Sequence, residues 1–156
     1  MTDPYNPVDA EIRATAHRLL KTDHAALGTL LDGHPLVTRI GCLWHAEAGM
    51  LLLISDLSDH AKALAGETRC SLLVGEPGAK GDPLTHPRLT LMGRAEMCDK
   101  AAFRDTYLAA RPKTGLYYDF TDFRLHALRP ETALYNGGFG KAARLTMADL
   151  AADPAG

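Results

Sequence analysis

Short runs of alternating apolar and polar residues recur along this chain, and turn signals separate them. Strict alternation over four to eight residues predicts a strand with one buried face. Asp32-Gly33 is a hairpin turn signal between two such runs, and Gly93 inside a later run suggests a bulge. The pattern predicts strands at 25–31, 36–44, 50–55, 70–74, 88–97 and 123–128, with a candidate seventh at 132–135.

Apolar residues at helical spacing and capping signals predict three or four helices between or beside these strands. The first covers 7–22, with Asn6 as its N-cap and Pro7 at its first position. A second begins near Ser58, a third follows Asp99, and a capping motif at 146–149 indicates a short last helix. We expect 1–156 to be one domain, with residues 151–156 as a frayed tail.

Most neighbouring strands are joined as hairpins rather than through helices. This order favours an antiparallel sheet closed as a small barrel, decorated by helices, and argues against a doubly wound parallel sheet. The predicted fold class is therefore mainly β (α+β).

Composition excludes some classes of function but does not identify one. Apolar residues make up 46% and charged residues 23% of the chain, and the formal charge is −2, which gives no electrostatic case for nucleic acid. Cys42, Cys70 and Cys98 lie far apart and are odd in number, so we interpret them as buried reduced thiols. We find no signal peptide and no apolar run that could span a membrane, which predicts a cytoplasmic protein.

The strongest chemical signal is the segment from Met50 to Leu64. A buried strand ends at Ile54, a polar turn follows, and the helix near Ser58 points free backbone N–H groups at that turn. Ser55 and Ser58 add hydroxyl groups there, and Lys62 adds a positive charge. Arg39 reaches the same place if its strand pairs with the next one. Such a convergence is typical of a phosphate site, so we expect a phosphorylated cofactor.

Each of these residues also has a plainer interpretation. Arg39 could pair with Asp56 or Glu47, Lys62 could be solvated, and Ser58 could serve only as an N-cap. His60 could contact a ligand or point into solvent.

Other candidate groups carry weaker signals. The seven histidines show no spacing that supports a metal site, and no metal is expected. His86 and Arg88 follow a long polar loop and could line a ligand site. The aromatic segment 117–123 is interpreted as core and dimer contact, with stacking on a planar ligand as the alternative.

Four segments of the chain carry a family resemblance: Pro35–Arg39, Ile54–Lys62, Asp82–Leu91 and Gly137–Gly140. Together, and in this order, they resemble the pyridoxamine 5′-phosphate oxidase-like FMN-binding split barrels. Within that family they are most similar to the haem-utilisation (HugZ-like) branch. The resemblance extends from about Ala25 to Leu150.

The resemblance implies a six-stranded split barrel with Greek-key topology, a homodimer, and FMN at the dimer interface. It implies that Arg39 grips the FMN phosphate and that Thr38 and Ile40 place backbone groups near the flavin ring. Ser55 and Lys62 match further phosphate contacts. The expected cofactor-binding residues are Thr38, Arg39, Ile40, Ser55, Ser58, His60, Lys62 and, from the other subunit, Arg88.

The chain also departs from the family's pattern. It lacks the C-terminal histidine that binds haem in haem-degrading members, and it lacks the Arg-x-His motif of the true oxidases. The main hypothesis is therefore an FMN-dependent oxidoreductase with an unknown small-molecule substrate and unknown catalytic residues. The alternative is a haem-binding protein, non-enzymatic or haem-degrading, in which an internal histidine (His60, His86 or His126) binds the iron. A third possibility is a barrel without cofactor that serves assembly only.

Overall fold

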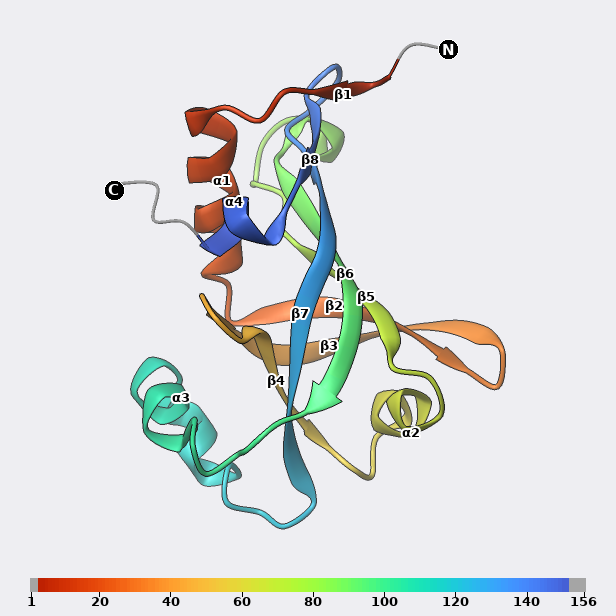
Figure 1. The fold of residues 1–156 in the computed structure, drawn as a ribbon, viewed down its shortest axis with the longest axis vertical. Coiled ribbons are helices and arrows are strands. Elements are labelled where there is room, and N and C mark those ends of the chain that lie inside the picture. Colours follow the sequence, from red (N-terminus) through yellow and green to blue (C-terminus); the bar gives the residue numbers. More distant parts are fainter. Residues whose placement is uncertain (1–2, 152–156) are drawn as a thin grey trace.

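The computed structural model describes residues 3–151 as a twisted, mainly β structure with helices at its edges (Figure 1). The strands are β1 (Tyr5–Asn6), β2 (His24–Leu31), β3 (His34–His45), β4 (Gly49–Ser55), β5 (Arg69–Val74), β6 (Arg88–Met97), β7 (Phe123–Asn136) and β8 (Ala142–Leu145). The α-helices are α1 (Ala10–Leu20), α2 (Asp59–Gly66), α3 (Arg104–Ala110) and α4 (Met147–Ala151), and short 3₁₀ turns cover Pro83–Thr85 and Pro112–Leu116.

Six antiparallel strands close into a barrel, which confirms the predicted fold. They pair in the order β7-β4-β3-β2-β5-β6, and β6 returns to pair with β7. The 14-residue β7 pairs with β6 from His126 to Asn136, while its other edge pairs first with β4 and then with β8. The short β1 lies parallel to β8 outside the barrel.

The predicted break between strands at 123–128 and 132–135 is wrong, because β7 is continuous. Opposite Met92 and Gly93 stand Thr132 and Pro130, so Glu131 is one extra residue in β7. Proline has no N–H to offer a neighbouring strand, and a bulge is a place where a sheet tolerates it. The bulge also confirms the irregularity that Gly93 suggested.

The predicted start of the first helix is also wrong. Asn6 belongs to β1, and the N-cap of α1 is Asp9, whose Oδ1 accepts a hydrogen bond from the Ile12 N–H over 2.8 Å. The helix after Asp99 begins only at Arg104. In contrast, Ser58 does cap α2, as predicted, and Thr146 and Asp149 form the predicted capping box of α4.

Two apolar clusters fill the molecule. The larger one occupies the barrel interior and is closed by α1 and α4 at one end and by Leu64 of α2 at the other. The smaller one lies outside the barrel, where Tyr107 and Tyr118 pack over the outward side of β4 and β7. Tyr118 is buried and donates a hydrogen bond to the Lys100 carbonyl, which agrees with the core interpretation of the segment 117–123.

The described part of the chain ends in a short helix. Ala151 ends α4, and the remainder of the expected tail, 152–156, lies outside the described residues. Within residues 3–151, no helix has the length and apolar character needed to cross a bilayer.

Candidate functional site

The turn between β4 and α2 adopts the predicted strand–turn–helix geometry. The Ser58 hydroxyl donates to the Ser55 carbonyl over 2.6 Å and accepts from the Ala61 N–H over 3.3 Å. A polar side chain at this position satisfies backbone groups that the first helical turn leaves free. The helix start is therefore fixed by its own residues.

Carboxylates surround this helix start. The Ser55 hydroxyl donates to Asp122 over 2.6 Å, and the Arg124 guanidinium pairs with Asp56 over 2.6 Å. Lys62 lies 3.9 Å from Asp59, and both of these side chains are largely exposed to solvent. Groups expected to hold a phosphate thus contact acids of the chain itself, which opposes a second anion at this place.

The three expected residues of β3 point in two directions, because successive side chains alternate across a strand. Thr38 and Ile40 face the barrel interior, whereas Arg39 is exposed on the outward side. The Thr38 hydroxyl lies 3.0 Å from His60 Nδ1, so β3 and α2 do meet. Burial lowers the pKa of His60 below its usual value.

Arg39 stands at the end of a row of residues on the outward face of the barrel. Ala26 of β2 pairs with Arg39 on one side and with Leu73 of β5 on the other, and Leu73 pairs with Thr90 of β6. The β3–β4 pairing stops at Gly41 and Leu53, two residues before Arg39 would face Ser55. No ion pair or hydrogen bond between side chains engages Arg39 within the described part of the chain.

Arg88 lies on the same outward face, two residues along β6 from Thr90. Its guanidinium donates to the carbonyls of Leu84 and His86, over 2.7 and 3.2 Å. Three strand spacings of about 4.8 Å each place the backbones of Arg39 and Thr90 roughly 15 Å apart, and Arg88 stands two residues further along β6. The outward face therefore has an arginine toward each side, with small and apolar residues between.

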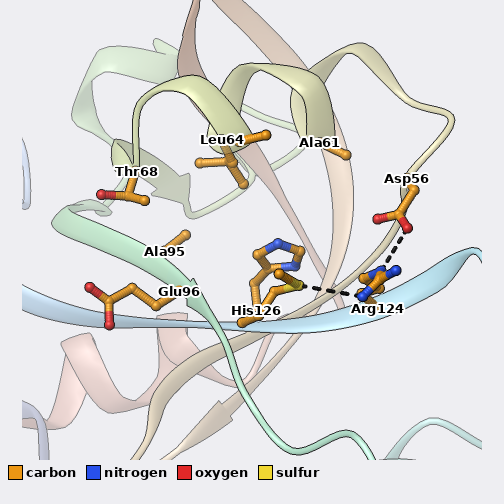
Figure 2. A pocket seen from close by; sticks show the side chains of 10 residues that line it. Asp56, Ala61, Leu64, Thr68, Ala95, Glu96, Arg124 and His126 are labelled. Atoms are coloured by element: carbon orange, nitrogen blue, oxygen red, sulfur yellow. Dashed lines mark hydrogen bonds and ion pairs between the residues drawn. The ribbon is translucent and has the colours of Figure 1, made fainter.

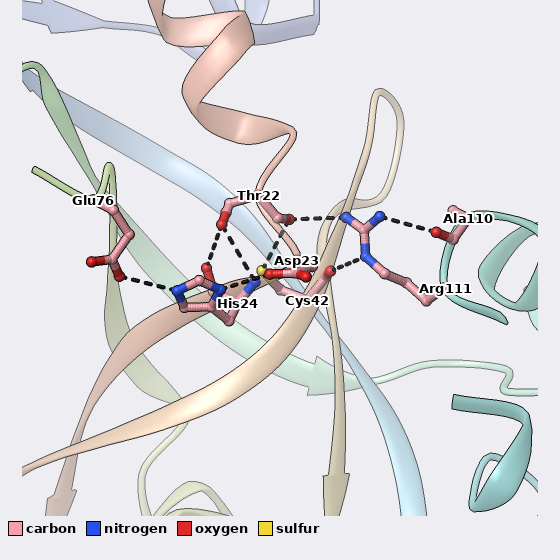
Figure 3. Close-up of polar contacts among 7 residues, drawn as sticks. All are labelled: Thr22, Asp23, His24, Cys42, Glu76, Ala110 and Arg111. Atoms are coloured by element: carbon pink, nitrogen blue, oxygen red, sulfur yellow. Dashed lines mark hydrogen bonds and ion pairs between the residues drawn. The ribbon is translucent and has the colours of Figure 1, made fainter. Parts of the chain in front are cut away.

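Sequence reasoning missed a polar cluster where β2 begins (Figure 3). His24 lies between two carboxylates, with Nδ1 2.6 Å from Asp23 and Nε2 3.0 Å from Glu76. Both partners only accept hydrogen bonds, so the geometry suits an imidazolium, and these contacts raise the pKa of His24. Arg111 donates to the carbonyls of Thr22 and Cys42 beside it, over 2.9 and 3.1 Å. No sequence motif links residues this far apart.

A second feature that sequence reasoning missed is a pocket of about 560 Å³ at the end of the barrel below α2 (Figure 2). His126 lines this pocket and is 7% exposed. Burial lowers the pKa of His126.

The cysteines fit the expectation of buried thiols in two of three cases. Cys42 and Cys70 are buried, Cys98 is half-buried, and all three are free. Burial raises the pKa of the Cys42 thiol to about 12 and that of Cys70 to about 11. These two thiols are therefore protonated at neutral pH and poor nucleophiles.

Comparison with known proteins places this site in a family context. No family model matches the chain. One solved structure superposes with a TM-score of 0.83 at 41% identity, covering 92% of this chain and 97% of that chain. A heme-binding protein from Mycobacterium smegmatis superposes with a TM-score of 0.80 at 31% identity, covering 94% of this chain and 61% of that one. A protein of the pyridoxinephosphate oxidase family from Clostridium acetobutylicum, 17% identical, shares the fold with a TM-score of 0.69 over 92% of this chain and 99% of that one.

The chain has the split-barrel fold of the pyridoxamine 5′-phosphate oxidase-like proteins. Among curated proteins, it is 33% identical over 116 residues to the chloroplastic noncanonical heme oxygenase HOZ of Arabidopsis thaliana. That match covers 71% of this chain and 34% of the plant protein, so the chain spans about a third of its relative's length. These neighbours confirm the resemblance of this split barrel to the haem-utilisation branch.

Proposed function

We propose that this protein binds haem on the outward face of the barrel, between Arg39 and Arg88. Its relatives include a heme-binding protein and a heme oxygenase, which supports the haem alternative over the flavin enzyme of our main sequence hypothesis. Haem is a flat apolar ring with carboxylates at its edge. It needs an apolar floor beside cationic groups.

The observation that carries this proposal is the composition of the face itself. Ala26 and Gly28 leave the backbone of β2 open to a flat ligand, and Leu73 offers 47% of its surface to solvent. Arg39 is exposed at one side and free to pair with a carboxylate. The haem would be the protein's ligand or substrate rather than a fixed part of it.

We also propose that a second copy of the chain covers this face. Leu30, Val37, Leu73 and Met92 lie on the outward sides of β2, β3, β5 and β6, and each exposes at least 40% of its surface. Several exposed apolar side chains on one face of a sheet are typical of an interaction surface. A homodimer would bury it and enclose the ligand.

The first test is a haem titration followed by the Soret absorbance of the bound pigment. Arg39→Gln removes one charge-assisted contact and should weaken haem affinity about tenfold. Arg13→Gln, which changes an arginine on α1, is the matched control and should leave affinity unchanged. Failure of the unmodified protein to change the haem spectrum would contradict the proposal.

Breakdown of haem is the finer proposal, drawn from the plant relative. Incubating the haem complex with ascorbate in air separates two outcomes. Loss of the Soret band with appearance of a bilin supports an oxygenase, and a stable band supports binding without turnover.

FMN is a competing ligand that would share Arg39 with the haem face. The exposed cations Arg39 and Lys62 favour it, while Asp59 and Asp122 beside the helix start oppose a phosphate there. Flavin absorbance of the purified protein, or its quenching of FMN fluorescence in a titration, distinguishes FMN from haem. With a bound flavin, the protein would be an oxidoreductase acting on a small-molecule substrate.

A further inference from the structure

The pocket at the end of the barrel is separate from the outward face proposed for haem. It lies between α2 and the final residues of β6, with β7 as its floor (Figure 2). Small apolar side chains, Ala61, Leu64 and Ala95, form its inner walls. Its volume of about 560 Å³ falls within the range of small-molecule sites.

His126 is the buried polar group of this pocket. Its side chain rises from β7 toward α2, and its Nδ1 has no hydrogen-bond partner among residues 3–151 (Figure 2). More than nine in ten buried polar atoms in proteins have a partner, so Nδ1 is an exception, but its enclosure keeps a ligand from reaching it, and the ring nitrogen that a bound molecule could meet is Nε2. Burial favours the neutral imidazole, which has a lone pair free to accept a hydrogen bond.

The charges around the pocket select the kind of molecule. Asp56 and Arg124 neutralise one another across 2.6 Å. Glu96 is exposed at the rim, and no described residue forms an ion pair with it. His60, in the first turn of α2, is close enough for its charge to lower the pKa of His126. Burial lowers the pKa of His60 itself, which favours its neutral form. Arg94 donates to Thr68 of the lining over 3.2 Å and lies 3.8 Å from Glu131, so this second pair adds no net charge. The rim therefore carries one net negative charge, from Glu96.

We propose that this pocket binds a small organic cation, an ammonium or amidinium group on a short apolar body. The apolar body would lie under α2 against Leu64 and Ala95. The cationic group would donate a hydrogen bond to His126 and pair with Glu96 at the rim. An anion of the same shape would meet an unpaired carboxylate and bind poorly.

Three probes of one shape and different charge test this proposal: benzamidine, benzamide and benzoate. Each is titrated into the ¹³C,¹⁵N-labelled protein near pH 7.5, and the ring signals of His126 are followed by NMR. We expect benzamidine to shift these signals saturably, benzamide to act more weakly, and benzoate to have no effect. No response to millimolar benzamidine, or an equal response to all three probes, would overturn the proposal.

A rim variant makes the test independent of folding defects at the buried histidine. Glu96→Gln changes an exposed side chain and should weaken benzamidine binding about two- to fivefold, the effect of one partly exposed ion pair. Glu11→Gln, an exposed acid on α1, should leave binding unchanged. Equal affinities in Glu96→Gln and the unmodified protein would show that charge does not select the ligand. Haem binding should be unaffected by both variants, which keeps this site distinct from the haem face.

Discussion

The Ser55 hydroxyl donates a hydrogen bond to the Asp122 carboxylate over 2.6 Å. This contact joins the end of β4 to the residue before β7, and the backbone bond from the Asp56 N–H to the Asp122 carbonyl reinforces it. The Ser55 hydroxyl, which we expected from the sequence to bind a phosphate, therefore already donates to a side chain of the protein. The same contact puts a negative charge where a phosphate would have to bind.

Replacing this acid is a direct test of the anion site. Asp122→Asn keeps an acceptor for Ser55 and removes the charge. If FMN phosphate binds at the start of α2, this variant should raise FMN affinity about two- to fivefold, because one repulsive surface contact is lost. Riboflavin, which has no phosphate, should show no change in the same fluorescence titration. Identical FMN affinity in both proteins would place the phosphate elsewhere.

The two candidate cations can be separated by single substitutions. Arg39→Ala should weaken FMN binding about tenfold, because a charge-assisted hydrogen bond is lost. Lys62→Ala should have a smaller effect, because its ammonium is exposed and already lies near Asp59. Isothermal titration of each variant measures both effects. A larger loss for Lys62→Ala would reverse our ranking of the two residues.

The proposed dimer depends on the outward face of the barrel. Leu73→Arg places a charge at its centre and should convert a dimer into a monomer, as measured by light scattering. Leu116→Arg is the control, because Leu116 is 82% exposed and belongs to the turn Pro112–Leu116 rather than to the four strands of this face. A monomeric unmodified protein that still binds haem would contradict an interface site.

Protonation of His24 should stabilise the fold in acid. Its pKa is raised by Asp23 and Glu76 above the ordinary 6.5, so its contribution is complete below that value and is lost as the pH rises through the folded-state pKa. Urea unfolding at about pH 5.5 and pH 8.5 should show a smaller difference between the two pH values for Glu76→Gln than for the unmodified protein. Equal pH dependence in the two proteins would show that the contact between protonated His24 and Glu76 does not contribute to stability.

Local signals in the sequence predicted much of the barrel. The Asp32-Gly33 turn needs positive φ at both positions, and both residues adopt it, at 51° and 81°. Ser58 caps α2 because its short hydroxyl side chain can accept a hydrogen bond from a free backbone N–H in the first helical turn. Turn and capping signals arise from residues close together in the sequence, so a single amino-acid sequence is enough to predict them.

Other elements depend on contacts that no local pattern encodes. The segment 142–145 holds two alanines and no β-branched residue, and it becomes β8 only because β7 offers it an open edge. The strands predicted at 123–128 and 132–135 are one strand, because the bulge opposite Gly93 accommodates Pro130 within β7. The unpartnered imidazole of His126 likewise arises from the placement of α2 over the barrel end. Its surroundings come from segments about 30 to 70 residues apart.

The seam between β6 and β7 has a consequence for the order of events during synthesis. A ribosome releases the chain from its N-terminus, and five of the six barrel strands emerge before residue 123. Until β7 follows, the facing sides of β4 and β6 remain two open edges, which can pair with other chains. The growing polypeptide therefore stays vulnerable to aggregation until its last fifth has emerged.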